Sequence, residues 1–121
     1  MTINISEAIQ SLNTKSGNNH EYVMTGTPTN EAEYKLQVKF VESENENGSA
    51  IFSLTQPYSW SAVSAEQSAL QTAYDANKYQ RDREKIYPSW QEQMDMQYHD
   101  TVNSTTTWND AIKAVKDKFP K

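Results

Sequence analysis

Apolar and polar residues alternate through the first eight positions of residues 33–41, EYKLQVKFV. This period of two is typical of a strand with one buried face. An Asn-Gly step at 47–48 then marks a turn, and the strand pattern resumes over residues 50–56. Because a lone β-hairpin is marginal in water, we expect residues 20–25 to add a third strand. The apolar positions of the first strand are Tyr34, Leu36, Val38 and Phe40.

Helical spacing dominates most of the remaining sequence. Ser6 is placed to cap a short helix that ends by residue 14. Ser64 and Gln67 form a capping-box pattern, and most residues from there to about Lys85 are good helix formers. The sequence therefore predicts one long helix after the hairpin.

The last third of the chain predicts two amphipathic helices joined by a short polar turn. Pro88 disfavours helical geometry at Tyr87 and suits the first turn of a new helix, and Thr107 is placed to cap the following one. The apolar stripe of the first helix is Trp90, Met94, Tyr98 and Val102, and that of the second is Trp108, Ala111, Ile112, Val115 and Phe119. We expect the two stripes to pack together as an α-hairpin over residues 86–121.

Met96 lies about 200° around its helix from Met94, so both cannot face the interior of the hairpin. Methionine and aromatic residues are common in cores and enriched in interfaces. We therefore interpret Met96 as available to a partner. The residues expected to carry the hairpin packing are Trp90, Met94, Tyr98, Trp108 and Ile112. The remaining candidates for packing or interaction are Trp60, Tyr87, Val115 and Phe119.

These elements predict an α+β fold: a small antiparallel hairpin or three-stranded sheet, a long helix, and a C-terminal α-hairpin. Residues 1–60 would form a β-rich attachment region and residues 61–121 a helical region. Hydrophobic residues make up only 36% of the 121 residues, so the core is expected to be thin. Oligomerisation or docking on a larger assembly would then add stability to each half.

Composition argues against several classes of function. The net charge of -5 disfavours binding to nucleic-acid phosphates, and no apolar run is long enough to span a membrane. The absence of cysteine excludes thiol catalysis, disulfides and thiolate metal sites. The first ten residues lack the basic and apolar regions of a signal peptide, so we expect synthesis in a cytoplasm.

Candidate chemistry is sparse. Asp95 and His99 are four residues apart, with Glu92 one turn earlier, a spacing that metal ligands on one helix face can use. An ordinary Asp–His pair on a solvated helix is the favoured alternative. Six acidic residues lie between positions 75 and 100, but nothing sets the cleft that paired catalytic carboxylates need. Nucleophile and phosphate-binding motifs are missing. We therefore expect a protein that is not an enzyme and that has no cofactor.

Residues 81–121 carry a series of motifs in a fixed order: Arg81, Arg83, Tyr87-Pro88-Ser89, Glu92-Gln93-Met94-Asp95-Met96, Tyr98-His99-Asp100, Trp108 and the end AIKAVKDKFPK. In the order and spacing of these motifs, the C-terminal third resembles small structural and tail-associated proteins of tailed bacteriophages, including cyanophages. The segment PYSWSAV at 57–63 is similar to a step that often follows a hairpin in such proteins. Trp90-Gln91 and Met94 depart from the usual residues but keep an apolar helix face.

The resemblance implies a structural or accessory protein in the tail region of a virion. The partners it implies are tail, baseplate or fibre proteins and other copies of the chain, with no nucleic acid, membrane, enzyme activity or cofactor. An assembly chaperone absent from the mature virion is the main alternative. A metal-dependent hydrolase built on Asp95 and His99, and an inhibitor of one host enzyme, are the other hypotheses.

Overall fold

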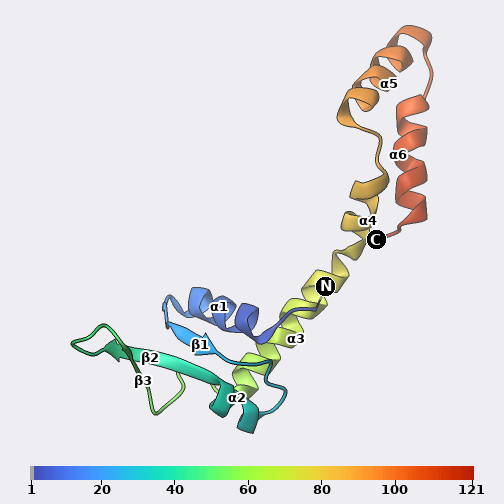
Figure 1. Cartoon of the computed structure of the whole chain (residues 1–121). Helices are drawn as coiled ribbons and strands as arrows, with labels where there is room; N and C mark the ends of the chain where they lie inside the picture. The colour runs from blue at the N-terminus through green and yellow to red at the C-terminus, as the bar shows by residue number, and fades with distance from the viewer. Residues whose placement is uncertain (1) are drawn as a thin grey trace. The chain divides into compact units, whose positions relative to one another are not determined.

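The computed structural model describes residues 2–121 and confirms the α+β fold (Figure 1). The contacts divide the chain into two units, one ending at Ala73 and the other running Tyr74–Lys121, so the division falls inside a helix. Among residues 2–121, no helix has the length and apolar character needed to cross a bilayer. In chain order the elements are α1 (Ile5–Ser16), β1 (Tyr22–Met24), α2 (Glu31–Gln37), β2 (Val38–Glu44), β3 (Ala50–Phe52), α3 (Trp60–Ala76), α4 (Lys78–Ile86), α5 (Trp90–Asn103) and α6 (Thr107–Lys118).

The sheet has three antiparallel strands in the order β1-β2-β3, so both the hairpin and the predicted third strand are confirmed. Tyr22 pairs with Phe40 on one side of β2, and Val41 pairs with Phe52 on the other. The turn between β2 and β3 uses Gly48 at φ 77°, a conformation that favours glycine. Strand β3 is shorter than predicted because regular pairing ends at Phe52.

The predicted strand over 33–41 is wrong in its first half, where α2 forms instead. Asn30 caps this helix by accepting from the Glu33 N–H at 2.9 Å, and Glu31 pairs with Lys35 one turn later at 3.0 Å. Tyr34 is fully buried, whereas Leu36 is 71% exposed, so the two do not share a face as they would in a strand. The helix cap therefore outweighs the local alternation of apolar residues.

The core of the first unit lies between α1, α2, the sheet and α3. Tyr34 donates its hydroxyl to the Tyr58 carbonyl at 2.8 Å, and burial together with the neighbouring Tyr58 raises the pKa of Tyr34 to about 12. Trp60 is half-buried against this core, with its ring 5.6 Å from that of Tyr34. The buried members are Ile5, Ala8, Ile9, Tyr34, Val38, Phe40 and Val63.

Polar contacts reinforce this packing. Asn13, the buried polar residue of α1, accepts from the Tyr58 hydroxyl at 2.7 Å and donates to the His20 carbonyl at 3.1 Å. Glu66 on α3 accepts from Ser11 at 2.6 Å and from Lys15 at 2.5 Å, both on α1. A thin apolar core is thus supplemented by hydrogen bonds from segments far apart in sequence.

Several predicted helix boundaries differ from those in the structure. The first helix is capped by Asn4 rather than Ser6 and continues to Ser16. Helix α3 begins at Trp60 because the Ser59 hydroxyl accepts from the Ala62 N–H at 3.1 Å, four residues before the predicted capping box at Ser64. A long helix follows the sheet as predicted, but it is interrupted at Asn77, which divides it into α3 and α4.

Candidate functional site

Helices α5 and α6 form the predicted α-hairpin in the second unit. Helix α5 starts with a reciprocal capping box, in which Ser89 accepts from the Glu92 N–H at 3.2 Å and the Glu92 carboxylate accepts from the Ser89 N–H at 3.0 Å. Pro88 therefore precedes the cap and does not stand in the first turn. The helix ends at Asn103, and its C-cap residue Ser104 adopts the left-handed conformation with φ 54°. Local sequence thus sets both ends of α5.

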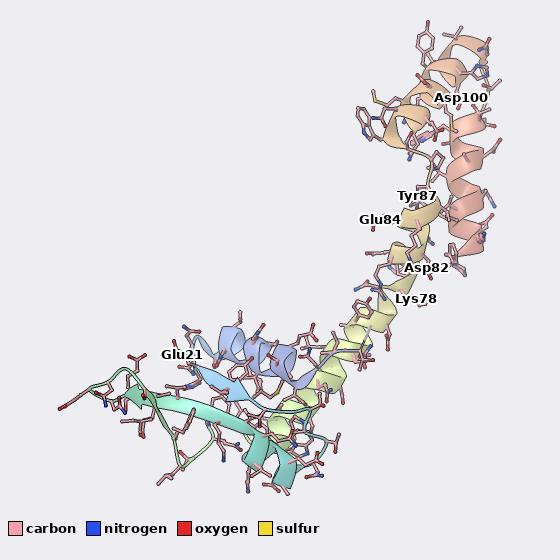
Figure 2. All side chains as sticks on the ribbon, viewed as in Figure 1. Glu21, Lys78, Asp82, Glu84, Tyr87 and Asp100 are labelled. Carbon is pink, nitrogen blue, oxygen red and sulfur yellow. The ribbon has the colours of Figure 1, made fainter. Side chains whose placement is uncertain are left out.

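Asp100 on α5 holds the start of α6 (Figure 2). Its carboxylate accepts from the backbone N–H groups of Thr107 and Trp108, both at 2.9 Å. It also accepts from the Thr105 hydroxyl at 2.6 Å and from the Thr107 hydroxyl. The N-cap residue Thr106 makes no side-chain capping bond. The predicted cap at Thr107 is therefore replaced by a carboxylate supplied from the preceding helix.

These contacts control the ionisation of Asp100. Desolvation raises its pKa, but the donors at Thr105, Thr107 and the Trp108 backbone outweigh that effect and hold the pKa well below the usual carboxyl range. The ionised form is favoured in the folded chain. Its stabilising contribution is therefore present above the unfolded pKa of about 3.9 and is lost as the pH falls through the folded value.

We expect Asp100→Asn to lower the melting temperature at pH 7 by several degrees, because the ionised acceptor is lost. The difference in melting temperature between the variant and the unsubstituted chain should shrink toward pH 2. At that pH the unfolded form of the unsubstituted chain binds a proton at Asp100. Thermal melts followed by circular dichroism at both pH values measure this. Asp95→Asn removes the same charge from an exposed position of α5, and it should leave the melting temperature at pH 7 nearly unchanged.

The inner face of the hairpin is more polar than predicted. On α5 the half-buried side chains are Gln93, Met96 and Asp100, which recur at helical spacing. Trp108 on α6 donates its indole N–H to the Gln93 amide oxygen at 3.2 Å. The α6 side of the packing consists of Trp108, Ala111, Ile112 and Phe119, which are half-buried, and Val115, which is buried. Tyr87 is half-buried where α4 ends, and Arg83 on α4 donates to the Phe119 carbonyl at 2.8 Å.

The predicted packing face of α5 lies on the outside instead. The exposed fractions are 66% for Trp90, 58% for Met94, 75% for Tyr98 and 61% for Val102. We call these four residues the α5 stripe. Met96, expected to be free for a partner, faces the interior. The two roles are reversed because Gln93 and Asp100 must face α6 to accept from Trp108 and Thr107. The sequence contained a signal for this orientation: Asp100 is an acidic residue seven positions before Thr107, where α6 starts.

The Asp95–His99 pair does not form a metal centre in this structure. Both residues are exposed, and the His99 ring nitrogen Nδ1 lies 3.1 Å from the Asn103 amide nitrogen. No group of three His, Asp or Glu side chains within residues 2–121 is arranged to hold a metal ion. The geometry therefore gives the hydrolase hypothesis no ligand set.

A second exposed apolar surface lies in the first unit. Ile51 and Phe52 are exposed on opposite faces of β3, and Leu54, two residues beyond the end of β3, is fully exposed. We call Phe52 and Leu54 the β3 patch. A groove of about 400 Å³ lies beside Leu54. It is lined by Glu31, Lys35, Val38, Lys39, Phe40, Ser53, Leu54, Thr55, Gln56, Tyr58 and Ser59. We expected part of the free surface of the sheet to be available to a partner, and in the structure Phe52 and Leu54 are the exposed apolar residues beside this groove.

The two units differ in formal charge. Residues 1–73 contain eight acidic and three basic residues, which accounts for the whole net charge of -5. Residues 74–121 contain eight of each sign and are neutral. The α5 stripe thus belongs to a neutral unit and the β3 patch to an acidic one.

Comparisons of the chain with protein-family models, with curated proteins and with solved structures found no match.

Proposed function

We propose that this chain is a non-enzymatic attachment protein in the tail region of a tailed-phage particle, where it docks on tail, baseplate or fibre components. One observation carries the docking role. Within residues 2–121, ten large hydrophobic side chains are exposed, while only nine hydrophobic residues are buried. Four of the exposed side chains recur every four residues along α5, and exposed apolar side chains grouped in this way are typical of protein interaction sites. The phage context comes from the motifs of residues 81–121.

The β3 patch is the surface that we assign to the particle. Leu54 is fully exposed, so it contributes nothing to the core, and it borders the groove beside β3. An apolar side chain on a partner protein could bury Leu54 together with Phe52. The lysines of the groove, Lys35 and Lys39, would form a polar rim.

Quantitative mass spectrometry of purified phage particles tests this proposal. We expect the chain at a fixed ratio to the major tail protein, in multiples of three or six copies, as symmetric tail structures require. Absence from particles together with abundance in infected cells would contradict the virion role and favour the assembly chaperone.

Complementation of a deletion phage tests the β3 patch itself. We expect Leu54→Glu to reduce the copies per particle at least about tenfold, since a charge would replace a buried apolar contact. Ser49→Glu, which adds the same charge in the exposed turn before β3, is the matched control and should be incorporated normally. Equal incorporation of the two variants would exclude the β3 patch as the attachment surface.

A further inference from the structure

We infer that the α5 stripe binds a second copy of this chain, so that two α5 helices pair in antiparallel orientation around a two-fold axis. This inference rests on the proposed docking role and assigns the partner of one of its two surfaces. Three observations support it: the charge of the unit, the area of the stripe, and the order of large and small residues along it.

The charge of the second unit permits self-association. Two copies of the whole chain repel each other, but all of the net charge lies in residues 1–73. By helical spacing, Gln91, Gln97 and Thr101 share the side of α5 that carries the stripe, and all three are exposed and uncharged. Asp95 is the nearest charged residue and borders the stripe. An uncharged surface on a neutral unit can therefore meet its own copy without burying an unpaired charge.

The area of the stripe matches a weak dimer. Aromatic side chains such as Trp90 and Tyr98 bury roughly 150–250 Å² each when fully covered, Met94 and Val102 bury less, and the four members are about two-thirds exposed. Each copy thus offers roughly 400–500 Å² of apolar surface, within the range of functional surface patches. Two copies bury about 1,000 Å² together with their uncharged borders, which is the lower limit for a specific interface.

The order of residues selects the antiparallel arrangement. A two-fold axis midway along the stripe places Trp90 opposite Val102 of the second copy and Met94 opposite Tyr98. The largest side chain then meets the smallest, and the flexible methionine meets an aromatic ring, a favourable contact. A parallel pair would place Trp90 against Trp90 and leave a gap at Val102. Antiparallel helices also oppose their dipoles favourably.

Sedimentation equilibrium of the purified full-length chain tests the dimer. We expect the weight-average mass to rise from near the monomer value toward the dimer value as the concentration passes through about 10–100 µM, the range of the dissociation constant of a weak interface. Met94→Lys should weaken association at least about tenfold. His99→Lys adds the same charge to an exposed position of α5 outside the stripe, and it should change affinity less than about twofold. A chain that stays monomeric, or a dimer that tolerates Met94→Lys, would overturn the inference.

Cysteine cross-linking tests the orientation, because the chain contains no native cysteine. We expect a mixture of Met94→Cys and Tyr98→Cys chains, oxidised with glutathione disulfide, to form the mixed dimer in preference to either homodimer. A dominant Met94→Cys homodimer would overturn the antiparallel arrangement. Both experiments use the purified chain alone, so their failure is distinct from a failure to find the protein in phage particles.

Discussion

Replacing Tyr34 by alanine is expected to lower the free energy of unfolding by about 3–5 kcal/mol, the usual cost of deleting a buried aromatic side chain. Tyr34 is fully buried, and its hydroxyl donates to the Tyr58 carbonyl. The variant would leave both a cavity and an unpaired carbonyl in the core of the first unit. Urea denaturation followed by tryptophan fluorescence measures the loss, since Trp60 contacts Tyr34 directly.

Leu36→Ala is the matched control, because Leu36 lies two residues away on the same helix and is mostly exposed. Its cost should be within about 0.5 kcal/mol. In a continuous strand over residues 33–41, Tyr34 and Leu36 would share one buried face and both substitutions would be costly. Similar large losses for the two variants would therefore contradict the helix and restore the strand.

The mistake at α2 has a physical explanation. Apolar residues at alternating positions also include pairs four apart, so Tyr34 and Val38 suit a helix that runs into a strand as well as they suit one strand. The start signal at Asn30 and Glu33 decides between them, and it was visible in the sequence. The second half of the pattern was predicted correctly because Val38 and Phe40 alternate with exposed Lys39 on a paired strand.

The α-hairpin could be predicted from the sequence, but the inward face of α5 could not be chosen from hydrophobicity. Apolar content pointed to Trp90, Met94 and Tyr98, whereas hydrogen bonding selected Gln93 and Asp100. With the α5 stripe turned inward, Gln93 and Asp100 would point away from α6, and the indole N–H of Trp108 and the first N–H groups of α6 would lose these acceptors. The N–H groups at the start of α6 need acceptors, and this requirement would have indicated the opposite face of α5 as the one that packs on α6.

The partition of charge gives the two units separate roles in the proposed function. The neutral unit can join two copies through the α5 stripe. The acidic unit presents the β3 patch, and the net negative charge of this unit disfavours self-association through that surface. A dimer of this kind would present two β3 patches, and two weak contacts to one particle bind more tightly than either alone.

The second large effect is expected for Trp108→Ala, which should lower the free energy of unfolding by about 2–4 kcal/mol, since the side chain is half-buried between α5 and α6. The substitution also leaves the Gln93 amide oxygen without its indole donor. Circular dichroism during urea denaturation, at concentrations well below those that support association, measures the change in the isolated chain.

Trp90→Ala supplies the comparison that separates packing from docking. Both tryptophans belong to the same unit, but Trp90 is 66% exposed. Its removal should change the free energy of unfolding by less than about 0.5 kcal/mol at low concentration and should weaken dimer formation at higher concentration. Trp108→Ala should show the reverse pattern. Its main effect should be on the free energy of unfolding, because Trp108 packs between α5 and α6 and is not part of the α5 stripe. If the two substitutions destabilised the dilute chain equally, Trp90 would be a packing residue. That result would contradict both the exposed position of the α5 stripe and the dimer that we infer from it.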